Sequence, residues 1–175
     1  MARSSTLILL AVSTLLPFAA CAPSGYGSVN GVKFDLCQPL TVTPDPTATA
    51  DQMDGIAQGM ALWNQLAGAH LVLAGDPTAS ASAPSLPLHF QHAAGNFHGL
   101  YDPSTAQVFI NNDLTGHPRT VTITHELGHS FGLVHISPDE RPSVMNPANL
   151  TIEPTAADVA ALAAIWGTCS TTPAP

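Results

Sequence analysis

Three histidines and a glutamate lie close together in the segment Thr124–Ser137, which reads THELGHSFGLVHIS. His125 and His129 are four residues apart, so on a helix they share one face and can both reach a single ion. Imidazole nitrogen is a preferred zinc ligand, and a catalytic zinc usually has three protein ligands and a water. Glu126, beside this pair, is suited to take a proton from such a water and deliver it to a leaving nitrogen. The spacing therefore predicts a hydrolytic zinc centre on a helix.

The third zinc ligand is expected from outside that helix. Gly132 can adopt a positive φ and let the chain leave the helix sharply, which would bring His135 to the same ion. Structural zinc is normally closed by four protein ligands, often including cysteine, whereas only three histidines converge here. The pattern therefore favours a catalytic centre with one zinc ion over the alternative, a non-catalytic zinc-binding surface lipoprotein.

The pattern His125-Glu126-x-x-His129-x-x-Gly132-x-x-His135 resembles the metzincin clan of zinc peptidases, closest to its matrixin-like group. Ten residues after His135, the sequence SVMNP is similar to the methionine turn of that clan, in which Met145 would form an apolar floor beneath zinc. Pro147 follows Met145 as in the matrixins and adamalysins.

Two further features bear on the resemblance. The segment TAADVAALAAIWG is similar to the last matrixin helix, with matches at Asp158, Ile165, Trp166 and Gly167. A serine follows the third histidine in matrixins, whereas Ile136 stands there in this chain. The resemblance implies a zinc metalloendopeptidase that hydrolyses peptide bonds in proteins or peptides, with Glu126 as the catalytic base.

The alternation of strand-like and helix-like segments predicts a mixed α/β or α+β domain. The resemblance narrows this to α+β: a mixed, mostly parallel five-stranded sheet with an antiparallel edge strand, an active-site helix, a methionine turn and a C-terminal helix. Residues 96–101 are the expected edge strand, against which an extended peptide would pair. The other strands are expected at 31–37, 70–74, 88–92 and 106–111.

Apolar residues at spacings of three and four predict a helix over residues 50–67, with Trp63 in the core. Asp51 would cap this helix or complement its dipole, and Gly68 would end the helix. The proline-bearing segment before the helix, residues 39–47, is expected to be a connection.

The N-terminal residues predict that the protein is exported. Residues 1–20 combine a basic Arg3, a short apolar run and small residues, as in a cleaved signal peptide. Cys21 follows a sequence similar to a bacterial lipobox and is a candidate for lipidation, with simple cleavage after Ala20 or Ala22 as the alternative. Residues 21–30 would be a tether, residues 31–169 a single metallopeptidase domain, and residues 170–175 a tail.

The charge composition limits the classes of partner that the protein is expected to bind. The net charge is −8 with four basic residues, so nucleic acid and anionic membranes are excluded as expected partners, and a membrane would be met only through lipid on Cys21. We expect a monomer located outside the cell or on its surface.

Three cysteines are present, and if Cys21 is lipidated a disulfide between Cys37 and Cys169 is the simplest arrangement in an oxidising compartment. Two free thiols, with Cys37 acting on the metal, are the alternative.

Several polar residues have competing interpretations. A second zinc set from His89, His92 and His98 is an alternative to solvated or hydrogen-bonded histidines, which we favour. Calcium bound by Asn111–Asp113 is an alternative to a turn that caps the zinc-binding helix. Arg141 is expected to be a solvated loop charge.

Overall fold

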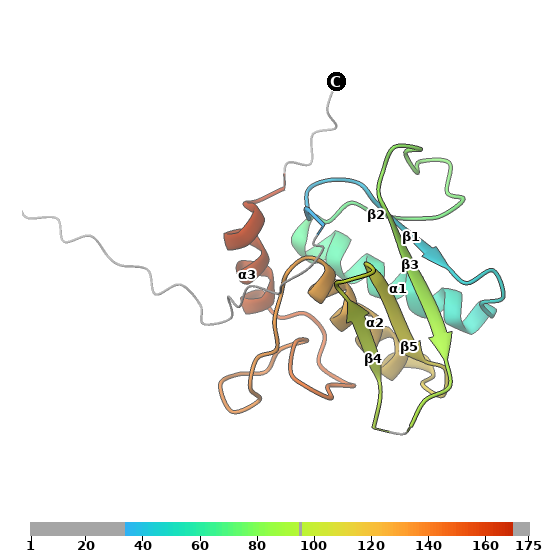
Figure 1. Ribbon diagram of the computed structural model, residues 1–175. Coiled ribbons are helices and arrows are strands. Elements are labelled where there is room, and N and C mark those ends of the chain that lie inside the picture. The colour runs from blue at the N-terminus through green and yellow to red at the C-terminus, as the bar shows by residue number, and fades with distance from the viewer. Residues whose placement is uncertain (1–33, 95, 170–175) are drawn as a thin grey trace, which may run out of the picture.

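The structure, a computed structural model, describes residues 34–94 and 96–169 (Figure 1). The predicted signal peptide and tether, the lipidation candidate Cys21 and the tail 170–175 lie outside the described residues. Within the described ranges, no helix has the length and apolar content needed to span a membrane.

Five strands form one mixed sheet in the order β2-β1-β3-β5-β4. The parallel strands are β1 (Leu40–Pro44), β2 (Leu71–Leu73), β3 (Ser85–Gln91) and β5 (Gln107–Asn111). The edge strand β4 (Gly99–Asp102) pairs antiparallel with β5. The α+β class, the mostly parallel five-stranded sheet and the antiparallel edge are therefore confirmed.

Helix α1 (Ala50–Ala67) has the predicted bounds. Its N-cap is Thr49, which forms a reciprocal capping box with Gln52, and its C-cap is Gly68 at φ 67°. Trp63 is fully buried, and its indole N–H donates to the carbonyl of Thr124 at 2.8 Å. The core residue predicted in α1 thus also fixes the position of α1 against the helix that carries the histidines.

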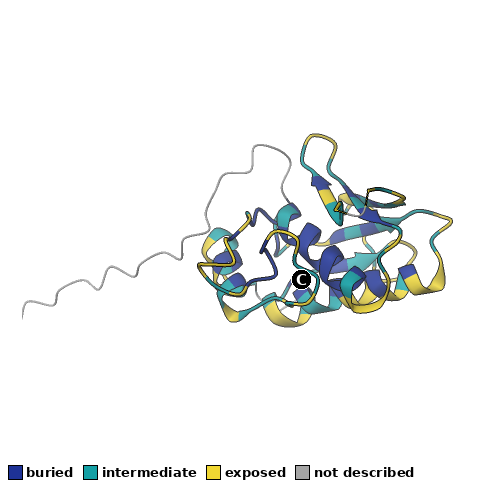
Figure 2. Ribbon diagram, turned by 90° about the horizontal axis from the view of Figure 1, so that it is seen from below, coloured by how far each residue is buried: buried dark blue, intermediate teal, exposed yellow. Residues whose placement is uncertain are grey.

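Helices α1 and α2 (Gly116–Ser130) pack side by side on one face of the sheet, while α3 (Ala156–Trp166) lies beside α1 (Figures 1 and 2). Pro118 is in the first turn of α2, where a missing N–H breaks no helical bond. Every residue of α2 from Arg119 to Gly128 is buried. Helix α2 is therefore held from all sides, which fixes the direction of its side chains.

The strand predicted at residues 31–37 is wrong for its described part, residues 34–37, which form a turn. The Asp35 carboxylate accepts the Cys37 N–H at 2.9 Å, and this local bond competes with strand pairing. Strand β1 lies instead at Leu40–Pro44, within the segment predicted to be a connection, with Leu40 and Val42 buried. Alternating apolar residues occur in both segments, and only the second is paired.

Other boundaries differ by a few residues. Strand β3 begins at Ser85, three residues before the predicted start, and includes Pro87, which the sequence places in a loop because proline lacks an N–H. Asp51 lies in the first turn of α1, where its charge complements the helix dipole as predicted, while Thr49 is the cap. The Asp51 carboxylate also pairs with the Arg119 guanidinium of α2.

Cys37 and Cys169 form a disulfide, as predicted, with their Cα atoms 5.0 Å apart. The bond connects the turn before β1 to the residues just after α3. It closes a sequence separation of 132 residues and therefore joins the two ends of the described fold. The alternative of free thiols does not hold for this pair.

Candidate metal centre

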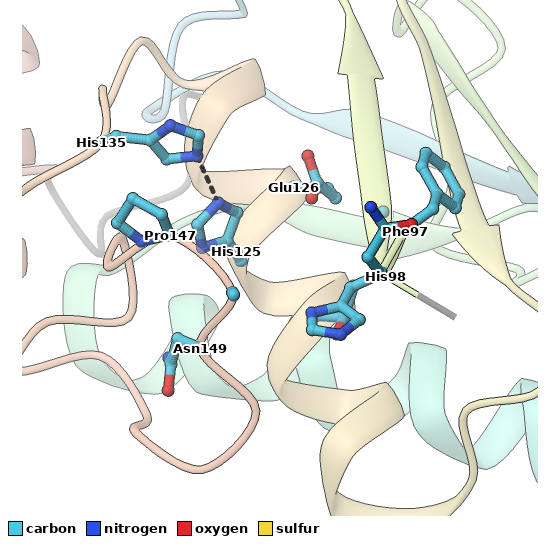
Figure 3. A pocket seen from close by; sticks show the side chains of 11 residues that line it. Phe97, His98, His125, Glu126, His135, Pro147 and Asn149 are labelled. Carbon is cyan, nitrogen blue, oxygen red and sulfur yellow. Dashed lines mark hydrogen bonds between the residues drawn. The ribbon is translucent and has the colours of Figure 1, made fainter. Parts of the chain in front are cut away.

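Helix α2 and the segment after it bring three imidazoles together. His125 and His129 lie one turn apart on α2, and His135 approaches from the chain beyond the helix (Figure 3 shows His125 and His135). The three Nε2 atoms lie 3.1 Å (His125 to His129), 3.1 Å (His125 to His135) and 3.2 Å (His129 to His135) from one another. Within the described ranges this is the group of histidine, cysteine or acidic residues that could hold a metal ion.

The approach of His135 depends on the chain reversal after α2. The helix ends at Ser130, and Gly132 has φ 98°, a conformation that glycine adopts without strain. The Leu133 N–H donates to the Gly128 carbonyl at 3.0 Å and closes the reversal. Gly132 therefore makes the turn two residues beyond the end of the helix, rather than ending the helix itself.

Backbone carbonyls orient two of the rings. Nδ1 of His125 lies 2.7 Å from the Val144 carbonyl oxygen, and Nδ1 of His129 lies 2.8 Å from the Leu133 carbonyl oxygen. A carbonyl oxygen can only accept a hydrogen bond. The protons therefore belong on Nδ1, which leaves the Nε2 lone pairs directed at one another. Such an outer hydrogen bond is the usual companion of a metal-binding histidine.

The spacing of the nitrogens fits zinc. Four tetrahedral ligands at the usual zinc–nitrogen distance of about 2.05 Å are separated by about 3.3 Å. The observed separations of 3.1–3.2 Å lie close to this value. Three neutral imidazoles with one direction left open match the donor set of a catalytic site rather than a closed structural one.

Burial keeps these imidazoles neutral. Desolvation, with a smaller contribution from the neighbouring histidine His129, lowers the pKa of His125 to about 3. Desolvation likewise lowers the pKa of His129 to about 4, and it lowers that of the more exposed His135. Because metal binding requires the deprotonated ring, the site is ready for a cation at neutral pH.

Glu126 projects from α2 toward β4 (Figure 3). Its Oε2 accepts the Tyr101 backbone N–H at 2.8 Å, which fixes the carboxylate beside the triad in a cavity that His125 and His135 also line. Burial raises the pKa of Glu126 to about 8, and the bond from Tyr101 acts in the opposite direction. A carboxyl with this pKa can both accept and return a proton near neutral pH.

Gly99 allows α2 and β4 to approach each other. A Cβ atom at this position would lie 2.8 Å from Thr122 Cγ2 and 2.9 Å from Glu126 Oε1, closer than real contacts allow. Gly99 was not among the residues predicted to form the site. A glycine inside a strand pattern is a known sign of close backbone approach, and that signal could have identified it.

The turn that contains Met145 lies against α2. Met145 is 1% exposed, and its sulfur occupies the space where a Cβ of Gly128 would lie. The Ile136 N–H donates to the Met145 carbonyl at 3.1 Å, which connects this turn to the residue after His135. Pro147 is exposed and lines the same cavity as His125.

Asp158 of α3 organises this turn from behind. Its carboxylate accepts the Ser143 hydroxyl at 2.5 Å and the Val144 N–H at 3.1 Å, and it also caps α3 through Thr155. The expectation that Arg141 is a solvated charge is wrong, because its guanidinium donates to Asp158 at 3.2 Å. A carboxylate that is 1% exposed needs such a partner, and Arg141 provides it.

The remaining histidines do not form a second zinc set. His89 pairs with Asp45 at 2.7 Å, and His92 pairs with Asp113 at 3.0 Å. Asn111 is the last residue of β5, and Asn112 and Asp113 form the predicted turn after it. This turn does not cap α2, because the N-cap is Thr115, which makes no side-chain cap bond. Asn111 Nδ2 donates instead to the Phe97 carbonyl at 2.8 Å and ties β5 to the segment before β4.

Two pockets flank Glu126 and His135. The first, here called the Asn149 pocket, has a volume of about 180 Å³ and is lined by Asn96, Phe97, His98, Gly99, Thr122, His125, Glu126, His135, Pro147, Ala148 and Asn149 (Figure 3). The second, the Tyr101 pocket, has a volume of about 320 Å³ and is lined by Gly99, Leu100, Tyr101, Glu126, His129, Val134 and His135. The three-histidine group therefore lies at the junction of the two pockets, beside the edge strand β4.

No protein-family model matches the sequence, and a search of curated proteins gives no significant match. The functional assignment therefore rests on the geometry of the site.

Proposed function

We propose that the protein is an exported zinc-dependent endopeptidase of the metzincin type. The observation that carries this proposal is the set of three Nε2 atoms, 3.1–3.2 Å apart, with Glu126 in the same cavity. The disulfide between Cys37 and Cys169 is compatible with export. The two pockets beside the edge strand β4 provide room for an extended peptide, which can bind by adding a strand to a sheet edge.

Each residue of the centre has a distinct role in this proposal. His125, His129 and His135 bind zinc, and Met145 supports them from the turn packed against α2. Zinc bound there would lower the pKa of a water to about 7 and polarise the carbonyl of the scissile bond. Glu126 takes the proton from the attacking water and delivers it to the leaving amine, so that one carboxyl serves both steps.

The Tyr101 N–H keeps Glu126 in position for this exchange. It donates to Oε2, so Oε1 is the oxygen left to receive the proton. Glu126 is 5% exposed, so little water screens its carboxyl group. Its electrostatic interaction with charge that develops in the transition state is therefore stronger than it would be in water.

The proposal is tested by loading the folded protein with one equivalent of zinc and incubating it with a proteome-derived peptide mixture. We expect new peptide termini that disappear when a chelator removes zinc and reappear when zinc is restored. If the protein has full zinc occupancy and cleaves no peptide, the proposal is wrong and the alternative, a non-catalytic zinc-binding surface protein, is favoured. Replacing His129 with alanine should abolish both zinc binding and cleavage, because two imidazoles bind zinc far more weakly than three.

A further inference from the structure

His98 differs from the other surface histidines in its surroundings. His89, His92 and His117 each contact a carboxylate, from Asp45, Asp113 and Glu153 respectively. Among the described residues, His70 and His98 both lack a side-chain hydrogen bond or ion pair, and of these two His98 is the one that lines a pocket. Its ring lines the Asn149 pocket, across from Pro147 and Asn149 (Figure 3). An imidazole without a protein partner in a pocket beside the metal centre is available to a ligand.

The other polar side chains that form this pocket already have partners or lack charge. Asn149 uses its amide nitrogen on the carbonyls of Val144 and Ile152, and its oxygen accepts two backbone N–H groups. The Thr122 hydroxyl donates to the Pro118 carbonyl at 2.9 Å. Asn96 is exposed and neutral.

The distribution of charged side chains in the described part of the chain also favours His98 as the partner of an anionic group. Both arginines there are paired, Arg119 with Asp51 and Arg141 with Asp158. The pocket contains no carboxylate except that of Glu126. A hydrogen bond between an imidazole and an ionised acceptor is roughly twice as strong as one between neutral groups.

We propose that His98 is a specificity-determining residue and that the Asn149 pocket binds an acidic side chain of the substrate, aspartate or glutamate, next to the cleaved bond. This proposal rests on the proposed peptidase function and adds the class of substrate. The Tyr101 pocket, lined by Leu100, Tyr101 and Val134, binds a bulky apolar side chain on the other side of that bond. The preferred site is therefore a peptide bond between an apolar and an acidic residue.

The binding test uses the Glu126→Gln protein loaded with zinc, so that no peptide is consumed. Two peptides that differ only in aspartate against asparagine at the position of the Asn149 pocket are titrated, and affinity is measured by calorimetry. We expect the aspartate peptide to bind about tenfold more tightly. This ratio should fall to about one in the protein that also carries His98→Ala, and His98→Lys should preserve it.

The matched control is His70→Ala. His70 is a half-buried histidine next to β2, at the opposite edge of the sheet from β4. The aspartate-to-asparagine ratio should be unchanged by this substitution. Equal affinity for the two peptides, or a ratio that survives His98→Ala, would overturn the proposal.

Cleavage provides a second readout. In a digest of a peptide library by the zinc-loaded protein, aspartate and glutamate should be enriched on one side of the cleaved bond, and His98→Ala should remove that enrichment without altering the apolar preference on the other side. Cleavage without an acidic preference contradicts the role of His98 alone. Absence of all cleavage contradicts the peptidase function, while the binding ratio still decides the role of His98.

Discussion

The carboxylate of Asp158 accepts the backbone N–H of Val144 at 3.1 Å, and the carbonyl of the same residue accepts Nδ1–H of His125 at 2.7 Å. One peptide segment therefore connects a buried acid at the start of α3 to a ligand of the proposed metal. Asn149 donates to the same carbonyl at 3.2 Å. The orientation of His125 therefore depends on α3, although His125 and Asp158 are 33 positions apart in the chain.

Asp158→Asn is expected to weaken zinc binding about tenfold, because substitutions in the outer hydrogen-bond partners of metal ligands typically cost ten- to a hundredfold in affinity. The amide still accepts from Val144, but it loses the charge that holds Arg141. Competition with a chelator measures the affinity. Asp139→Asn, an exposed acid in the loop before Arg141, is the control and should bind zinc as the wild type does. If the folded Asp158→Asn protein binds zinc as tightly as the wild type does, Asp158 does not influence the zinc-binding histidine His125 through Val144.

Gly99→Ala should reduce peptide cleavage by about a hundredfold, since displacing a reacting group by about 1 Å has effects of that size. The added methyl would press on both Thr122 and Glu126 Oε1. Overpacking should also lower the free energy of unfolding by about 1–3 kcal/mol. Adding Thr122→Ser removes one of the two contacts, so it should restore part of the stability while cleavage stays low. Full recovery of cleavage in this double variant would show that Glu126 is not displaced.

Glu126→Gln should stabilise the metal-free protein in a pH-dependent manner. Burial raises the pKa of the Glu126 carboxyl from 4.5 to about 8 in the folded state, so the unfolded state releases this proton first. The Glu126 carboxyl therefore lowers the stability of the wild type progressively as pH rises from about 4.5 to about 8, and the glutamine variant lacks this contribution, while the histidines titrate in both proteins. The difference in free energy of unfolding should grow across this window to the order of 5 kcal/mol and then level off. Urea denaturation at pH 4.5, 6, 8 and 9 in the presence of a chelator measures it, and a difference independent of pH would be the contrary result.

The disulfide between Cys37 and Cys169 should contribute about 3–5 kcal/mol to the free energy of unfolding, because it closes a long loop in the unfolded chain. The double variant Cys37→Ser/Cys169→Ser is the direct test, compared with wild type by thermal and urea denaturation. A change below about 1 kcal/mol would indicate that the reduced chain retains contacts between its ends.

The three-histidine group was predictable from sequence because the spacing of its members is local. A helical repeat of four places His125 and His129 on one face, and a glycine that permits a chain reversal brings in His135. Helix α1 was predictable for the same reason, since its apolar repeat and its terminal Gly68 are all within one segment.

The residues that support the centre depend on long-range contacts and could not be predicted in this way. Arg141 has the sequence context of a solvated charge, and only the fold brings it to Asp158. The misplaced first strand has a similar cause, since Phe34 and Leu36 alternate as well as Leu40 and Val42 do, and the Asp35 turn decides which pair lies in the sheet.

The proposed role of Glu126 is tested most directly by comparing zinc content and peptide cleavage in the wild type, Glu126→Gln and Glu153→Gln. Glu153 is an exposed glutamate, and its variant serves as the matched control. The wild type and Glu153→Gln should bind one zinc and cleave peptides at equal rates. Glu126→Gln should bind one zinc as well, and its cleavage rate should fall at least a hundredfold. A Glu126→Gln protein that retains zinc and cleaves at the wild-type rate would contradict the proposed role of Glu126.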